Sequence, residues 1–291
     1  MKEEILGYQV DSYSVEDCVE RVFAVLVGPK VSRDFPWFAC LNPHSYALAL
    51  NDALFSRALK DADWLVPDGT GVVLASRVLR RGIRERVTGS DVFYGLHRRM
   101  NAAGGMSVFF LGSTEETLGS TKDRMARDYP NIRVAGTCSP PFKPTYSTAE
   151  LDAMLNAINA AAPDVLWVGM TAPKQEKWIF ENRGRLNAKF AGAIGAALDY
   201  YSGRVKRSHP FFRRFGLEWL MRLLRQPRRL WRRTFVSAPV FLWHVVLARF
   251  GANWHGGEMT SQASHTSRYD EGGSVATASS DLPWDKNTWP R

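Results

Sequence analysis

The chain has few cysteines, and they lie far apart. Its 291 residues contain three, Cys18, Cys40 and Cys138. An odd number of cysteines without a C-x-x-C pair argues against a disulfide framework or a zinc site of that kind, and it fits a reducing cytosol. Residues 1–5 show no positively charged stretch followed by an apolar one, so no secretory signal is expected. These absences favour a cytoplasmic protein.

The chain also lacks a hydrophobic run of membrane-spanning length. Residues 234–248 are mostly apolar, but they number about fifteen, whereas a spanning helix needs roughly 20. Pro239 and His244 interrupt the run near its middle. This pattern favours a peripheral or shallowly inserted element, and a helix packed on the protein's own core remains the alternative.

Two common cofactor motifs are missing. The sequence contains no G-x-G-x-x-G after an apolar run and no G-x-x-x-x-G-K-[ST]. Neither a dinucleotide-binding fingerprint nor a P-loop is therefore supported.

Acidic residues are almost missing from residues 204–233. This basic segment holds eleven Lys or Arg residues and one acid, Glu218, which gives it about +10 in a chain whose net charge is +9. Folding does not require such segregation, because like charges repel one another. A phosphate, a nucleic acid or an anionic membrane would be a natural partner. A solvated basic helix with a packed apolar face is the alternative. Aromatic residues in and just after the segment suit a lipid interface: Phe211, Phe212, Phe215, Trp219, Trp231, Phe235 and Trp243.

What the sequence does have is a regular alternation of short apolar runs and helical stretches. The runs cover 37–41, 64–67, 108–111, 132–135, 165–168 and 190–194, and the helical stretches cover 45–59, 114–127, 148–160 and 174–182. Ser14 and Ser113 have the spacing of helix caps. The alternation predicts an α/β fold with a mostly parallel, Rossmann-like sheet flanked by helices.

Composition divides the chain into three predicted parts. Residues 1–203 form the α/β core. Residues 204–255 form a basic, aromatic, helical appendage that associates with membranes. Residues 256–291 are rich in Ser, Thr, Gly and Ala and are predicted to be a disordered tail.

Ligands of such sheets bind beyond the carboxyl ends of the strands, so the polar residues that follow the apolar runs are the candidates. Asn42 follows the first run, and its amide can both donate and accept. Asp68 follows the second run and precedes Gly69, which lets a ligand approach closely, so it is a candidate general base. A helix cap for Asn42 and an Asx-turn for Asp68 are the structural alternatives.

Three further candidates follow later in the chain. Arg86 could reach a phosphate. Gln175 lies between Lys174 and Glu176 in the first turn of a predicted helix, where three polar residues exceed what a cap needs. Asp199 follows the last run and could accept hydrogen bonds from ribose hydroxyls. Asp61 and Asp63 form a D-x-D pair that could bind a metal, but their place before a run favours surface chemistry.

The order of several motifs resembles the WecG/TagA/CpsF family of bacterial glycosyltransferases over residues 5 to about 235. The motifs include Pro67-Asp68-Gly69-Thr70-Gly71, Pro173-Lys174-Gln175-Glu176 and Gly216-Leu217-Glu218-Trp219. Two positions depart from the family pattern. Cys40 stands where the family often has Thr. The chain reads Arg207-Ser208-His209-Pro210 where the family usually has Arg-Ala-Pro.

The resemblance implies an inverting transferase that moves an N-acetylmannosamine-type sugar or another hexose from a UDP-sugar to a polyprenyl-diphosphate-linked glycan. Such an enzyme would act in cell-surface polysaccharide synthesis, peripherally on the inner face of the membrane and without a metal cofactor. A homo-oligomer is possible, and no nucleic-acid partner is expected. The alternative is a non-enzymatic protein that binds nucleic acid through the basic segment.

The resemblance also implies roles for individual residues. Asp68 would be the catalytic base and Arg86 an active-site cation. Asn42, Gln175 and Asp199 would contact substrate or nucleotide. Arginines of the appendage would close over the site: Arg222, Arg229 and Arg232.

Overall fold

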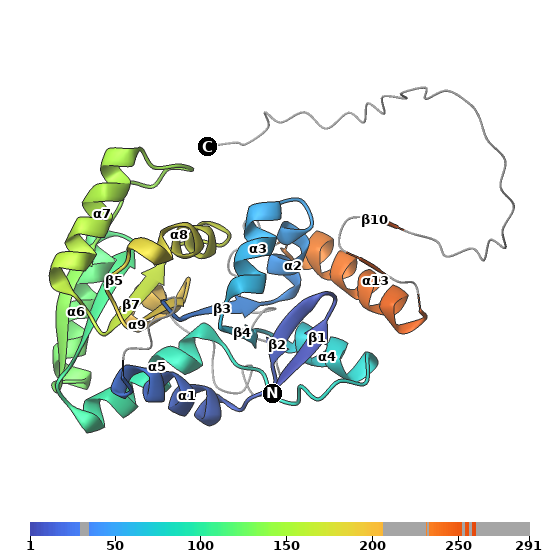
Figure 1. The fold of residues 1–291 in the computed structure, drawn as a ribbon, viewed down its shortest axis with the longest axis horizontal. Helices are drawn as coiled ribbons and strands as arrows, with labels where there is room; N and C mark the ends of the chain where they lie inside the picture. The colour runs from blue at the N-terminus through green and yellow to red at the C-terminus, as the bar shows by residue number, and fades with distance from the viewer. Residues whose placement is uncertain (30–34, 206–230, 232, 252–253, 256–257, 260–291) are drawn as a thin grey trace, which may run out of the picture. The chain divides into compact units, whose positions relative to one another are not determined.

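The core of the protein is a parallel sheet. The computed structural model describes residues 1–29, 35–205, 231, 233–251, 254–255 and 258–259 (Figure 1). Within them, six strands pair in the order β4-β3-β8-β7-β5-β6, all neighbours parallel. Their bounds are β3 (Trp37–Leu41), β4 (Trp64–Pro67), β5 (Met106–Gly112), β6 (Ile132–Cys138), β7 (Val165–Gly169) and β8 (Phe190–Ala193). The predicted α/β fold is confirmed.

Helices cover both faces of this sheet. Buried side chains of α1 (Val15–Val27), α5 (Gly89–Ala103), α6 (Glu115–Asp128) and α9 (Ala197–Tyr201) form one core cluster. The other face is packed by α2 (Pro43–Ala49), α3 (Ala53–Asp61), α4 (Thr70–Val78), α7 (Thr148–Ala161) and α8 (Lys174–Asn182), which a short turn at Arg183–Arg185 follows. Figure 1 shows α1 and α5 on the side of the sheet opposite α2, α3 and α8.

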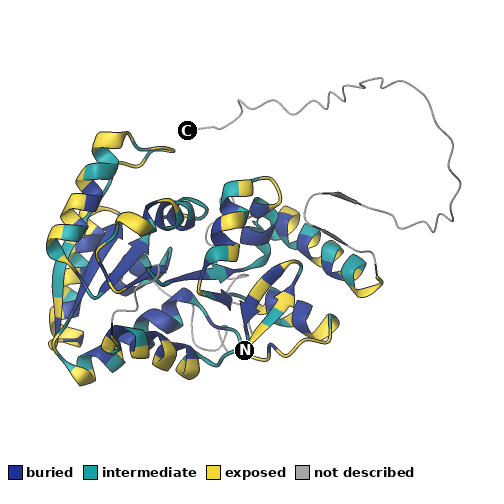
Figure 2. Cartoon of the chain, in the orientation of Figure 1, coloured by how far each residue is buried: buried dark blue, intermediate teal, exposed yellow. Residues whose placement is uncertain are grey.

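The apolar runs of the inner strands β3, β8, β7 and β5 are continuous because these strands are buried on both sides, whereas the edge strand β6 is partly exposed. In β7, Leu166 and Val168 join one cluster, while Val165 and Trp167 join the other. Successive side chains of a strand point to opposite faces, so a strand with two covered faces needs an apolar residue at every position. Figure 2 shows the strands as buried.

An N-terminal hairpin precedes the sheet and was not expected from the sequence. β1 (Lys2–Ile5) and β2 (Tyr8–Asp11) pair antiparallel through Leu6 and Gly7, whose φ angles of 50° and 83° are those of a tight hairpin turn. Asp11 accepts a hydrogen bond from the backbone N–H of Leu65 at 2.9 Å, which ties the hairpin to β4.

The stretch predicted as one helix over 45–59 is two helices. α2 ends at Ala49, and Asp52 starts α3 by accepting a hydrogen bond from the N–H of Phe55 at 2.9 Å. The capping side chain offers the backbone an alternative to continuing the first helix, which explains the break.

The predicted cap at Ser14 is confirmed, but the cap at Ser113 is wrong by one residue. Ser14 accepts from the N–H of Asp17. Thr114 caps α6, and Ser113 adopts φ of 63° instead.

Among the described C-terminal elements, η2 and α13 pack on the core. They comprise η2 (Arg233–Ser237), α13 (Ala238–Arg249), β9 (Trp254–His255) and β10 (Glu258–Met259). Phe241 and Val245 of α13 are buried against the cluster that includes α2 and α4, whereas Leu242, Trp243 and Phe250 are exposed. No described helix is long and apolar enough to cross a membrane. Residues 206–230 of the predicted appendage and most of the predicted tail lie outside the described residues.

Candidate active site

Asn42 and Asp68 meet at the carboxyl ends of β3 and β4. The two strands pair in parallel register, with Leu41 opposite Pro67, so the residues that follow them are brought together. Asn42 Nδ2 donates to Asp68 Oδ2 at 3.1 Å. Both side chains are half-buried.

Asn42 is at the same time the cap of α2. Its Oδ1 accepts from the N–H groups of His44 and Ser45 at 3.0 Å each, and Ser45 Oγ accepts from the Asn42 N–H. The amide oxygen is therefore used by the helix and the amide nitrogen by Asp68. The capping alternative is correct, and it coexists with a contact to the candidate base.

Asp68 does not form the Asx-turn that Asp-Gly often makes. Within the part of the chain described here, its carboxylate accepts a hydrogen bond only from Asn42 and from no group of its own loop. Gly69 follows with φ of 98°, a conformation that favours glycine. Asp68 thus presents a carboxylate oxygen, Oδ1, that is available to a ligand.

Arg86 lies in the segment that passes this pair. The N–H of Val87 donates to the Pro67 carbonyl at 3.1 Å, so the segment before α5 runs beside the end of β4. Arg86 is half-buried there. The structure therefore brings three of the predicted site residues, Asn42, Asp68 and Arg86, to one corner of the sheet.

Gln175 occupies the neighbouring strand ends. It lies in the first turn of α8, after β7, and is buried with 5% of its surface exposed. Gln175 Oε1 accepts from the Gly195 N–H at 2.9 Å, and Nε2 donates to Glu176 Oε1 at 2.8 Å. The amide therefore bridges the loops that follow β7 and β8.

Asp199 lies beyond β8, toward the end of β5. Its Oδ1 accepts from Ser113 Oγ at 3.3 Å, and Ser139 Oγ donates to the Ser113 carbonyl at 2.8 Å. Gly112 precedes this serine with φ of 105°, and a side chain there would lie 2.8 Å from the Gly169 carbonyl oxygen. The absence of side chains lets the ends of β5 and β7 come close together.

The ends of β5 and β7 form a switch point in the topology of the sheet. β5 leads into α6 on one face of the sheet, and β7 leads into α8 on the other. Adjacent strands whose connections leave to opposite faces mark the switch point where α/β proteins bind ligands.

Two contributors to the site could not be identified from the motif positions alone. Cys40 lies between the two halves of the site, and desolvation, reinforced by Asp68 and Glu176, raises the pKa of its thiol well above the usual range. Glu176 is buried, and desolvation raises the pKa of its carboxyl to about 7. The cluster of polar residues after Pro173 was the only sequence signal for Glu176.

The Asp61 and Asp63 pair is not at this edge. Asp61 Oδ2 accepts from Trp37 Nε1 and pairs with Arg183, and Asp63 Oδ2 accepts from the Trp37 N–H. Both contacts are at the amino end of β3, opposite the site. Among described residues, no group of three or more His, Cys, Asp or Glu could hold a metal ion. Arg222, Arg229 and Arg232 lie outside the described residues.

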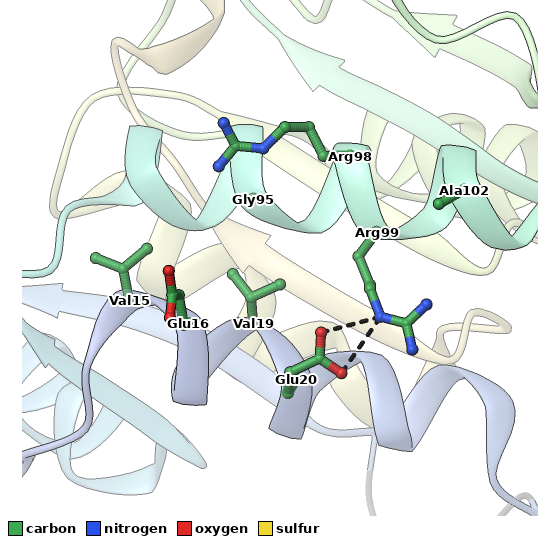
Figure 3. Close-up of a pocket in the computed structure, with 8 residues that line it drawn as sticks. All are labelled: Val15, Glu16, Val19, Glu20, Gly95, Arg98, Arg99 and Ala102. Carbon is green, nitrogen blue, oxygen red and sulfur yellow. Dashed lines mark hydrogen bonds and ion pairs between the residues drawn. The ribbon is translucent and has the colours of Figure 1, made fainter.

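A shallow groove also lies between α1 and α5, on the faces lined by Val19, Gly95 and Arg98 (Figure 3). Arg99 and Glu20 form an ion pair across it at 2.9 Å. It contains none of the candidate residues.

Known proteins are similar to this sequence over most of its length. The glycosyl transferase WecG/TagA/CpsF family matches residues 3–254. The N-acetylglucosaminyldiphosphoundecaprenol N-acetyl-beta-D-mannosaminyltransferase of Bacillus spizizenii is 33% identical over 226 residues, which are 77% of this chain and 84% of that protein. The protein of the same name from Staphylococcus aureus strain MW2 is 27% identical over 248 residues, 85% of this chain and 93% of that protein. The chain therefore belongs to the WecG/TagA/CpsF family of glycosyltransferases.

Proposed function

We propose that the protein is an inverting glycosyltransferase that moves a hexose, of the N-acetylmannosamine type or a related one, from a UDP-sugar to a polyprenyl-diphosphate-linked glycan. The observation that carries the proposal is the Asp68 carboxylate, held by Asn42 at the carboxyl ends of β3 and β4. The names of the relatives support the acceptor class.

The chemistry needs one base. A hydroxyl of the acceptor sugar attacks the anomeric carbon while the bond from that carbon to the diphosphate oxygen breaks. Asp68 Oδ1 takes the hydroxyl proton in this step. A single displacement from the opposite side inverts the anomeric centre, and UDP leaves with the electron pair of the broken bond.

The leaving diphosphate develops negative charge, which the site can stabilise without a metal. Arg86 supplies a permanent cation beside the end of β4. The N-termini of α6 and α8 lie at the same edge of the sheet and direct backbone N–H groups toward it. By family resemblance, Arg222, Arg229 and Arg232 add further cations. EDTA should therefore leave activity largely intact, and loss restored by Mg²⁺ or Mn²⁺ would contradict this part of the proposal.

The proposal places the protein on the inner face of the cytoplasmic membrane, as a peripheral protein. Three aromatic side chains of the C-terminal elements support this location because they are at least 50% exposed: Trp231, Phe235 and Trp243. Aromatic rings beside cations suit the headgroup layer of a bilayer.

The test combines a donor panel with one substitution. The purified protein is incubated with candidate UDP-sugars and a short-chain lipid-diphosphate acceptor. Asp68→Asn should lower kcat by roughly 10²–10⁴-fold while UDP still binds, because only the proton acceptor is lost. Asp123→Asn, on the exposed face of α6, is the matched control and should keep full activity.

Unchanged turnover in Asp68→Asn would remove Asp68 from the mechanism. Tight, salt-dependent binding of DNA or RNA without any sugar transfer would instead favour a nucleic-acid-binding protein.

A further inference from the structure

The amide of Gln175 is held from two sides. Its oxygen accepts from the Gly195 N–H at 2.9 Å, and its nitrogen donates to Glu176 Oε1 at 2.8 Å. A glutamine amide has two N–H groups and an oxygen with two lone pairs. One N–H and one lone pair therefore remain for a ligand at the strand ends.

Glu176 itself is held in an unusual environment. Its side chain is 2% exposed, and Oε2 has no hydrogen-bond partner among the described groups. The lysines beside it on α8 are engaged elsewhere: Lys174 Nζ lies over the ring of Tyr146 and donates to the Lys143 carbonyl, and Lys177 Nζ pairs with Asp52 at 2.9 Å.

We propose that Glu176 is a positioning residue for the transfer: its carboxyl fixes the Gln175 amide so that one N–H faces the donor's diphosphate-sugar. This inference rests on the proposed function. Glu176 acts through Gln175 and touches no reacting atom.

The carboxyl can do this while neutral. Burial raises the pKa of Glu176 to about 7, so the carboxyl exchanges its proton in the neutral pH range. In the neutral form Oε1 is the carbonyl oxygen and still accepts from Gln175, and the proton resides on Oε2. Cys40 on β3 is close enough for Glu176 to act electrostatically on its thiol, and Asp68 after β4 acts on the same thiol.

The neutral form also suits an anionic donor. Above pH 7 Glu176 ionises and adds a buried negative charge near the diphosphate, whereas below pH 7 it does not. Bound diphosphate should therefore raise the pKa of Glu176 further, and a rise of one unit corresponds to about tenfold weaker binding to the ionised form. UDP affinity should fall as the pH rises through 7.

The experiment compares two variants with the wild-type protein. Glu176→Gln keeps an oxygen acceptor for Gln175 but cannot ionise. Glu176→Met has a similar length and no acceptor. UDP binding is measured from pH 6.5 to 8.5, and kcat and KM for the donor are measured at pH 6.5. Lys177→Gln, one residue along α8, is the matched control.

We expect UDP affinity to fall up to about tenfold more from pH 6.5 to 8.5 in the wild type and Lys177→Gln than in Glu176→Gln. The UDP phosphate titrates in the same way in each experiment, so its contribution cancels when the variants are compared with the wild type. Glu176→Met should lose about 3- to 10-fold in kcat/KM at pH 6.5 through the lost hydrogen bond, while Glu176→Gln stays close to wild type.

Two results would overturn the role of Glu176 and leave the proposed function standing. One is the same pH dependence of UDP affinity in Glu176→Gln and wild type, and the other is full activity in Glu176→Met. If Glu176→Met fails to fold, the comparison with Glu176→Gln decides by itself. Wild-type protein that neither binds UDP nor transfers sugar would overturn the proposed function, and this assignment with it.

Discussion

At the scale of single residues, one amide both caps a helix and contacts the proposed catalytic base. Asn42 Oδ1 caps α2, and Asn42 Nδ2 holds Asp68. The two roles can be separated, because serine caps helices well but has no amide to offer Asp68 from this position. Asn42→Ser should keep the stability of α2, whereas Asn42→Ala should lose both roles.

Asn42→Ala should lower the free energy of unfolding by about 0.5–2 kcal/mol, and Asn42→Ser by much less. Both variants should lose turnover, because Asp68 is no longer oriented. Urea denaturation and kcat with the lipid-linked acceptor measure the two effects. An Asn42→Ser protein with full turnover would show that the contact to Asp68 does not matter for catalysis.

At the scale of elements, α13 is joined to the helix that carries the site. Tyr46 on α2 contacts His244 through its hydroxyl at 2.7 Å, and His44 Nδ1 lies 2.9 Å from Ser237 Oγ. The ring of Phe241 packs edge-on against Tyr46, with 5.3 Å between centroids. Since Asn42 caps α2, the C-terminal helix supports the element next to the proposed base.

Two aromatic residues of α13 test this packing. Phe241 is fully buried, so Phe241→Ala should lower the free energy of unfolding by about 3–5 kcal/mol. Trp243, on the same helix, is 61% exposed, so Trp243→Ala should change stability by no more than about 0.5 kcal/mol. Equal effects of the two substitutions in urea denaturation would contradict the packing of α13 on the core.

The sequence predicts elements best where the signal is local. Each strand of the sheet contains one of the predicted apolar runs or most of it, because two covered faces require apolar residues throughout. The N-terminal hairpin was missed because its two strands, with the sequences KEEI and YQVD, contain no apolar run. The break between α2 and α3 depends on the capping contact of Asp52, which apolar spacing does not reveal.

The candidate site shows the same division. Asn42 and Asp68 follow from their positions after apolar runs, and the parallel register of β3 and β4 brings them together. Glu176 could not be assigned a role from sequence, because its burial and its contact with Gln175 arise only when the ends of β7 and β8 meet. Long-range packing, rather than any local pattern, sets the chemistry of that carboxyl.

At the scale of the whole molecule, charge and exposed aromatic surface favour the same partner. Residues 204–233 carry about +10 of formal charge, against a net +9 for the chain. The exposed rings of Trp243 and Phe250 belong to elements that follow this segment. Truncation before α13 would remove Phe241 and Val245 from the core, so substitutions separate membrane binding from folding more cleanly.

The last prediction concerns this surface. The full chain should bind vesicles containing anionic lipid at low salt and bind neutral vesicles weakly, because each cation near an anionic surface contributes about 1 kcal/mol. Raising the salt to about 1 M, where the Debye length falls to roughly 3 Å, should release most of the protein. Trp243→Ala should weaken vesicle binding yet keep turnover on a soluble acceptor. Arg229→Ala should keep vesicle binding, because it removes one charge among many. It should lower turnover, because the family resemblance assigns this arginine to the leaving diphosphate. Equal binding to neutral and anionic vesicles would contradict the membrane-binding role of the basic segment. Full turnover in Arg229→Ala would contradict its catalytic role.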